Sequence, residues 1–293
     1  MMRAKDTLAI AVRKPDGEIL LETRPWVSFA QWNFLKKPFL RGFPILMETM
    51  VNGIKALNFS AQHALDEEED GELTPFHIFL TMLVAIAAAM GLFVVLPHFV
   101  TVGMEWLGVS GDVDSVSFHI WDGFFKLLIF VLYILAISLI PDIRRVFQYH
   151  GAEHKTIWAY EEGKELKPSA AHFFSRLHPR CGTAFLLFVM AVSIVLYTGL
   201  VPWLLTFYTP EHFVLKHLYI VGVKLFLMIP VSNVAYEMIR IAGKYGKNIV
   251  CKIMCWPGMM MQMLTTREPD ESQIEVAIAS LKAALEKEGI HNV

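Results

Sequence analysis

The sequence has few charged residues. Lys, Arg, Asp and Glu make up 18% of its 293 residues, whereas 55% are hydrophobic and the mean hydropathy is +0.45. Because a soluble domain carries about 25% charged residues, this composition favours a membrane protein. The net charge of −2 provides no basic excess, so we expect no nucleic-acid partner.

Cysteine is also scarce, and the three cysteines of the chain exclude a disulfide framework. The first thirty residues alternate in character instead of forming one apolar run, which argues against a cleavable signal peptide. Within them, Thr7 to Val12 and Glu18 to Glu22 flank the turn "KPDG", a pattern that predicts a β-hairpin. Residues 1–37 are therefore expected to form a small cytosolic β-hairpin segment.

Residues 38–64 are predicted to form an amphipathic helix. Polar side chains such as Glu48 and Asn52 fall on one side of it, and apolar side chains recur at helical spacing on the other. Such a helix is expected to lie along the membrane interface or to pack on a bundle, followed by an acidic linker over 65–75. The predicted apolar face comprises Leu40, Phe43, Met47, Met50, Val51, Ile54 and Leu57.

Four long apolar segments follow, at 76–100, 118–140, 183–207 and 213–241. Each approaches the ~20 residues that a helix needs to cross ~30 Å of hydrocarbon. The expected fold class is an all-α polytopic membrane protein with about four transmembrane helices, the interfacial helix and a small cytosolic part. That part combines the hairpin with a helix near the end of the chain.

Lys and Arg are distributed unevenly between the connecting segments. They are frequent in the loop 141–182 and in the tail 242–293, but are missing from the loop between the first two segments. Because basic loops stay in the cytoplasm, the expected topology is N-in and C-in, with the loop 141–182 in the cytosol. The tail ends in an amphipathic helix that is expected to dock on the hairpin or on another subunit.

The cytosolic loop contains the stretch "QYHGAEHKTIWAYEEG". Pro141 can open a helix there and Gly163 can end it. On such a helix His150 and His154 project from one face, with Glu153 beside them. The pattern H-x-x-E-H is one in which two histidines bind zinc and the glutamate acts as a base.

Further ligands are expected from "RLHPRCGT", which contains His178 and Cys181. Cys181 precedes an apolar helix, whose N-terminal dipole favours the thiolate that binds metals. His172 is a candidate to support the ligands. Three interpretations remain at this point: ordinary histidines, a structural metal site, or a catalytic site holding a divalent metal, with zinc as the expected ion.

Ionisable residues inside the apolar segments are candidates for function, because burying them in lipid is costly. They are Asp122, Lys126, Lys224, Glu237 and Arg240. The two lysines could also reach the membrane surface with their long side chains. Glu237 could pair with Arg240 or act as a further metal ligand.

Several stretches resemble the YqhQ-like family of bacterial membrane proteins, which are described as predicted metal-dependent enzymes. They include "PFLRGFPILMETMVNGIKALNFSA", "YHGAEHKTI", "HPRCGT" and "LTTREPDESQIEVAI", and the resemblance covers most of the chain. It implies a bacterial inner-membrane protein with His150, His154, His178 and Cys181 as metal ligands and Glu153 as base. The chain departs from the family at its start, where "MMRA" stands without the family's preceding Gly-rich stretch.

The sequence leaves several functions open. A metal-dependent hydrolase would use Glu153 to activate water for attack on an amide or ester. An oligomeric channel or transporter would use the intramembrane polar residues, with the His/Cys cluster as a structural or gating metal site. A scaffold would use its cytosolic ends to bind a partner. A homo-oligomer is expected for the channel, and lipid is the expected surrounding in every case.

Overall fold

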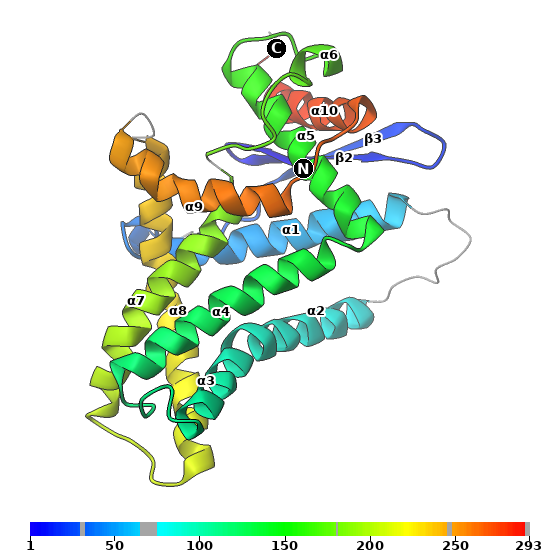
Figure 1. Cartoon of the computed structure of the whole chain (residues 1–293). Coiled ribbons are helices and arrows are strands. Elements are labelled where there is room, and N and C mark those ends of the chain that lie inside the picture. The colour runs from blue at the N-terminus through cyan, green and yellow to red at the C-terminus, as the bar shows by residue number, and fades with distance from the viewer. Residues whose placement is uncertain (30–32, 65–74, 180, 245–247, 291–293) are drawn as a thin grey trace.

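The computed structural model describes residues 1–29, 33–64, 75–179, 181–244 and 248–290. The described part is mostly helical and has one small sheet near the N-terminus. Long apolar helices lie toward one end, and the sheet lies with shorter helices at the other end (Figure 1). The predicted acidic linker falls almost entirely outside the described residues.

The described helices are of three types. Besides the short 3-10 helix η1 and the π-helix η2, all of them are α-helices. Their bounds are η1 Asn33–Lys36, α1 Gly42–Ala64, α2 Pro75–Met90, η2 Gly91–Val95, α3 Leu96–Trp106, α4 Val116–Ile137, α5 Pro141–Glu161, α6 Pro168–Ala171, α7 Thr183–Leu205, α8 Phe213–Lys244, α9 Ile249–Thr265 and α10 Glu271–Lys287.

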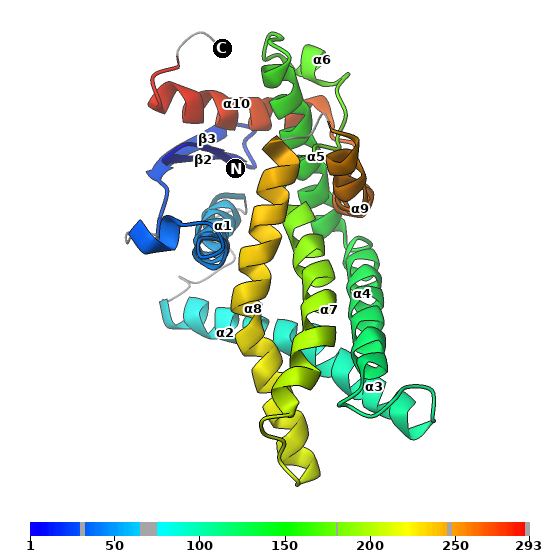
Figure 2. The same cartoon turned by 90° about the vertical axis from the view of Figure 1, so that its left-hand side faces the viewer.

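Four helical segments are long and apolar enough to cross a membrane: Leu83–Trp106, Val116–Ile137, Phe185–Leu205 and Phe213–Ala242. The last three agree closely with the predicted segments. The first begins and ends later in the chain than the predicted 76–100, and it runs from α2 into α3, whose axes differ in direction (Figures 1 and 2). The π-helix η2 joins them, and π turns are common where a helix changes direction.

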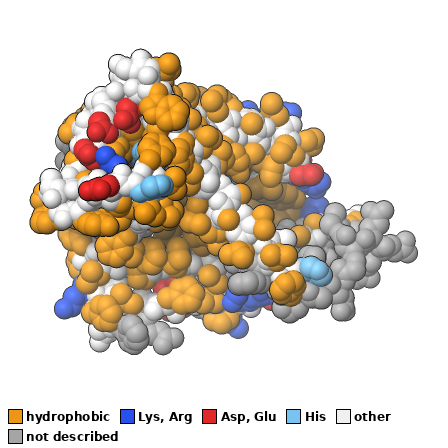
Figure 3. Space-filling view, turned by 90° about the horizontal axis from the view of Figure 1, so that it is seen from below, with side chains coloured by type: hydrophobic (Ala, Val, Ile, Leu, Met, Phe, Trp, Pro, Cys, Tyr) orange, Lys and Arg blue, Asp and Glu red, His pale blue; other side chains and the backbone are white. Residues whose placement is uncertain are grey.

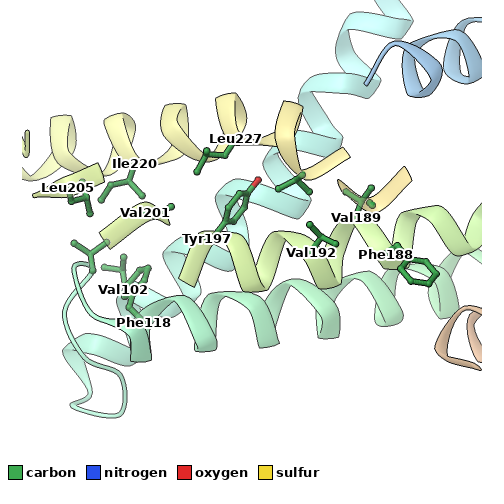
Figure 4. Close-up of a cluster of buried hydrophobic side chains, with 13 residues drawn as sticks. Val102, Phe118, Phe188, Val189, Val192, Tyr197, Val201, Leu205, Ile220 and Leu227 are labelled. Atoms are coloured by element: carbon green, nitrogen blue, oxygen red, sulfur yellow. The ribbon is translucent and has the colours of Figure 1, made fainter. Parts of the chain in front are cut away.

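The apolar core of the bundle lies between α3, α4, α7 and α8. Phe118, Val201 and Ile220 are fully buried there, and the hydroxyl of Tyr197 points toward α8 (Figure 4). The opposite surfaces of these helices carry exposed Leu, Ile, Val and Phe side chains. Hydrophobic side chains are also prominent in Figure 3, which shows the molecule from below.

The N-terminal sheet has three antiparallel strands, β1 Met2–Ala4, β2 Thr7–Arg13 and β3 Ile19–Pro25, in the order β1-β2-β3. The predicted hairpin is present as β2 and β3, but the sequence analysis missed β1. Helix α10 packs on this sheet, and the Ser280 hydroxyl donates to the Ala9 carbonyl at 2.9 Å. The sheet is thus one of the two docking partners predicted for the C-terminal helix.

Helix α1 is amphipathic, but it faces the protein with its polar side. Glu48 accepts hydrogen bonds from the Ser28 hydroxyl and from the Phe29 amide, both at 2.8 Å, and the Asn52 amide donates to the Val27 carbonyl at 3.0 Å. The helical period locates the two faces but does not identify which one meets the protein. Residues of the predicted apolar face that are exposed include Leu40, Met50 and Leu57.

Candidate metal centre

Helix α5 holds the His-x-x-Glu-His motif. It begins at Pro141, as predicted, and Gly163 follows its end with a φ of +62°, a left-handed conformation that glycine adopts readily. The rings of His150 and His154 are one helical turn apart, with centroids separated by 4.4 Å. Both face the N-terminal end of α7, where Cys181 lies.

His150, His154 and Cys181 come together although 31 residues separate the first from the last. One ligand atom from each of the three lies within 4.8 Å of the others. His150 Nε2 is 3.1 Å from Cys181 Sγ. His154 and Cys181 are buried and His150 is partly buried, so the group is largely screened from bulk solvent.

Backbone carbonyls fix the orientation of both imidazoles. His150 Nδ1 is 2.9 Å from the Thr265 carbonyl oxygen, and His154 Nδ1 is 2.6 Å from that of Arg176. Because a carbonyl oxygen only accepts hydrogen bonds, each Nδ1 carries the proton. Each neutral ring therefore has Nε2 as its remaining lone pair.

The thiol and the neighbouring imidazole shift each other's protonation. Burial acts to raise the pKa of Cys181, but hydrogen bonds with His150 and His154 outweigh it and lower the pKa to about 5. Burial acts to lower the pKa of His150, but the hydrogen bond and charge of Cys181 raise that pKa to about 9. The pair therefore favours a His150 imidazolium, protonated on both nitrogens, beside a Cys181 thiolate. The thiolate is the form of cysteine that binds metals and acts as a nucleophile.

Gly151 lets the chain before α10 approach α5 closely. A Cβ at this position would lie 2.2 Å from the Arg267 carbonyl oxygen. The Arg267 amide also donates to the Phe147 carbonyl at 2.9 Å. This close approach brings Thr265, two residues earlier, to His150. The glycine between the two motif positions is thus required by backbone packing.

The three residues open into a cavity of about 390 Å³. Glu153 lies on its wall, with its carboxylate 2.5 Å from the amino group of Met1. Glu161 lies there too, and the sequence analysis missed it, although it follows His154 by seven residues and therefore shares its helix face. The cavity is lined by Met1, Met2, Arg3, Ala4, His150, Glu153, His154, Ile157, Tyr160, Glu161, His178, Cys181, Gly182, Leu281 and Leu285.

His178 and His172 lie farther from the group than the sequence suggested. The ring centroids of His178 and His154 are 5.9 Å apart, and His178 Nε2 is 3.5 Å from a Glu161 oxygen. His178 thus contacts the cavity without joining the three close ligand atoms. The His172 side chain is exposed, and only its carbonyl turns inward, where it accepts from Lys155 at 2.7 Å.

Glu237 does not take either predicted position. Both of its carboxylate oxygens bond to the Arg41 guanidinium at 2.7 Å, and the Phe39 amide donates to it at 3.4 Å. Arg240 acts on Glu237 only through its charge. The predicted pairing with Arg240 was therefore wrong, because the better partner comes from the segment before α1, 196 residues away in the sequence.

Lys126 and Lys224 are buried in the bundle and do not extend to its surface. They are 6% and 1% exposed, and both contact Asp122, which is 1% exposed. The Nζ of Lys224 is 2.9 Å from one Asp122 oxygen, and that of Lys126 is 3.9 Å from the other. These residues form a second polar cluster inside the helical bundle.

Comparison with known proteins yields two matches. The family described as "Protein of unknown function (DUF1385)" matches residues 37–287. The chain is also 32% identical over 304 residues to "Uncharacterized protein YqhQ" of Bacillus subtilis (strain 168), covering 99% of this chain and 90% of that protein. No solved structure matches.

Proposed function

Because this chain belongs to the DUF1385 family, whose function is unknown, we propose a function from its geometry: a membrane-embedded, metal-dependent hydrolase. The proposed ligands are His150, His154 and Cys181. The observation that carries the proposal is the pair of Nδ1–carbonyl hydrogen bonds, which leave Nε2 of each ring as the atom for a shared ligand. On His150 a metal ion would take the place of the Nε2 proton that faces Cys181. Histidines that bind metals almost always donate their other ring N–H in this way.

The donor set fits zinc better than a hard cation. Two imidazole nitrogens and a thiolate are ligands that Zn²⁺ accepts, whereas Mg²⁺ and Ca²⁺ prefer oxygen. Three protein ligands with an open fourth position are typical of catalytic zinc, and structural zinc usually has four. The cavity beside the three residues supplies room for a substrate at that fourth position.

A zinc ion bound there would polarise a substrate carbonyl and make water more acidic. Glu153 lies on the cavity wall beside both histidines, where its carboxylate can accept the proton of the attacking water. His178, held by Glu161, lies where it can give a proton to the leaving group. Met2, Ile157 and Leu285 supply an apolar wall that favours a substrate with an apolar part.

The proposed setting is the bacterial cytoplasmic membrane, with both termini and the cavity on the cytoplasmic side. The uneven distribution of Lys and Arg supports this orientation. The apolar outer surfaces of the spanning helices fit the lipid bilayer. A homo-oligomer, which the channel hypothesis requires, stays a prediction.

Elemental analysis of the purified full-length protein tests the proposal. We expect about one zinc ion per chain in the wild type. His154→Gln should lose it, because a site that binds zinc through three protein ligands rarely retains the ion with only two of them. The matched control is His178→Gln, a histidine of the same cavity outside the ligand group, which should keep the metal. Metal absent from the wild type, or equally present in His154→Gln, would overturn the proposal.

Catalysis is tested separately with Glu153→Gln. This variant should keep the metal and lose the ability to complement a strain in which the gene is deleted. Full complementation by Glu153→Gln would remove Glu153 from the mechanism while leaving the metal site in place.

The 3.1 Å contact between Cys181 Sγ and His150 Nε2 favours a second candidate, a metal-free cysteine hydrolase. His150 is oriented by the Thr265 carbonyl, as a third group orients the base in nucleophilic catalysis. In this case the purified protein should hold no zinc, and Cys181 should be alkylated by iodoacetamide faster than Cys255. With zinc bound, Cys181 should react only after chelation.

A further inference from the structure

The second polar cluster lies within the bundle, away from the His/Cys site. Its charged members are Asp122 and Lys126 on α4 and Lys224 on α8. Three histidines that the sequence analysis did not select are buried around them: His98 on α3, His119 on α4 and His217 on α8. Three helices thus direct their ionisable side chains to one place.

The cluster members form a continuous chain of contacts. His217 Nδ1 is 2.9 Å from His98 Nε2, and His98 Nδ1 is 3.2 Å from Lys224 Nζ. Lys224 Nζ is in turn 2.9 Å from an Asp122 oxygen. Lys126 ends the chain, 3.9 Å from Asp122 and 4.6 Å from the centre of the Tyr197 ring.

The charges within this cluster do not cancel when both lysines are protonated. One aspartate faces two lysines, which leaves an excess of one positive charge among side chains that are at most 6% exposed. An uncompensated charge in a buried site is strongly unfavourable, so a buried group without a counter-charge tends to lose or gain a proton and become neutral. Loss of one proton from a lysine makes the cluster neutral.

Lys224 is the lysine placed to release that proton. Both lysines have an aromatic ring as a further partner for their charge, Tyr197 at 4.6 Å from Lys126 and Phe118 at 5.9 Å from Lys224. Lys224 also directly contacts an imidazole nitrogen that can accept a proton. His119 is buried on the same helix as Asp122, and neither of its ring nitrogens has a hydrogen-bond partner within the described part of the chain. The Tyr197 hydroxyl donates a hydrogen bond to the Lys224 carbonyl oxygen at 2.8 Å.

We propose that Asp122, Lys126 and Lys224 form a proton-binding site that exchanges its proton through His98 and His217 with the end of the bundle remote from the His/Cys site. The ligand is a proton, since the members contact one another directly and a proton needs no additional space. The proposal is independent of the hydrolase function.

The transfer balances in three steps. Lys224 gives a proton to His98 Nδ1, His98 passes its Nε2 proton to His217 Nδ1, and His217 releases its own Nε2 proton. Both histidines end neutral with the other tautomer, and Lys224 ends as a neutral amine. The cluster as a whole loses one positive charge.

His217 lies one turn into α8, near the loop that joins α3 to α4. Lys216 beside it is paired with Asp114 at 3.1 Å and lies 4.0 Å from Asp112. Glu105, at the end of α3, faces Asp112 and Lys216 as well. These acidic residues give a released proton acceptors at the end of the bundle.

Solid-state NMR of the full-length protein in liposomes, with ¹⁵N-labelled lysine, tests the proposal. Between about pH 6 and pH 9, where an unperturbed lysine stays charged, one lysine signal should change reversibly from charged to neutral. That change should be lost in Lys224→Met. The matched control is Lys216→Met, another lysine of α8, which should retain the change.

Lys126→Met gives a second test that does not depend on removing the exchanging group. It takes away the excess charge and leaves Asp122 and Lys224 as a neutral pair, so the protein should fold and Lys224 should stay charged throughout the range. His98→Phe, made in the otherwise unchanged protein, should slow the proton exchange of the Lys224 signal. A wild type in which every lysine stays charged, or a Lys126→Met variant that still titrates, would overturn the proposal.

Discussion

The His/Cys cluster and the Asp/Lys cluster differ in how their polar groups are satisfied. At the His/Cys cluster, a backbone carbonyl holds Nδ1 of each imidazole, the His150 Nε2 contacts Cys181 Sγ, and the three residues line a cavity. At the Asp/Lys cluster, the side chains serve as partners for one another. The first cluster takes part of its hydrogen bonding from the backbone and opens into a cavity, whereas the second keeps its charges by mutual contact.

This difference predicts how each cluster responds to substitution. A group held by backbone can lose a side chain with little effect on the others. A group held by mutual pairing cannot, because the remaining charge stays buried without a partner. Substitutions at the Asp/Lys cluster should therefore change stability more than those at the His/Cys cluster.

The largest expected effect is that of Asp122→Asn, which leaves two buried lysines without a counter-charge. We expect a loss of about 3–5 kcal/mol in the free energy of unfolding, measured by denaturant unfolding in detergent micelles. Adding Lys126→Met should recover part of it. Cys181→Ser replaces one side chain by another of nearly equal size and should lower the free energy of unfolding by about 1 kcal/mol. An equal loss of stability in Asp122→Asn and Cys181→Ser would contradict the comparison.

An intermediate effect is expected for Gly151→Ala, because the added methyl group would collide with the Arg267 carbonyl. Overpacking of this kind typically costs about 1–3 kcal/mol. It should also move Thr265 away from His150 and lower the metal content of the protein. Gly53→Ala is the control, since a Cβ there meets nothing within 4 Å, and a similar loss in it would remove the packing explanation.

The smallest effect is expected for Asp270→Ala at the start of α10. Asp270 and Gln273 form a capping box, and loss of such a cap costs about 1 kcal/mol. Leu281 and Leu285 of α10 line the cavity, so the metal content should fall slightly while lysine exchange in the bundle stays unchanged. A change in lysine exchange would show that the two clusters are coupled.

The contribution of Asp270 should also depend on pH. Partial burial acts to raise its pKa, but hydrogen bonds from Ser272 and Gln273 outweigh it and lower the pKa below its usual value. A carboxyl whose pKa is lower in the folded state stabilises above its unfolded pKa, and that contribution is lost as the pH falls. The difference between wild type and Asp270→Ala should therefore shrink below about pH 4.

Much of this fold was predictable because its signals are local. Segment length and hydropathy located the apolar helices, and Pro141 and Gly163 marked the bounds of α5. The spacing of His150 and His154 placed both rings on one face. These predictions need only the helical period and the residues at each end.

The rest required tertiary contacts that no local pattern contains. The sequence analysis expected both Cys181 and His178 beside the two histidines, but His178 contacts Glu161 instead because of the path that the chain takes between α6 and α7. Arg41 reaches Glu237 across 196 positions. The polar face of α1 is buried because the segment before it supplies donors to Glu48.

The π-helix Gly91–Val95 has a consequence for His98. A π turn takes up one more residue than an α turn, so it advances the phase of everything after it by about 100°. His98 follows within three residues and contacts His217. Deleting one residue from this turn would rotate the ring by about 100° and away from His217 without altering any residue of α3. A related sequence that is one residue shorter within Gly91–Val95 is therefore expected to lack the contact between His98 and His217, and with it the proposed proton exchange.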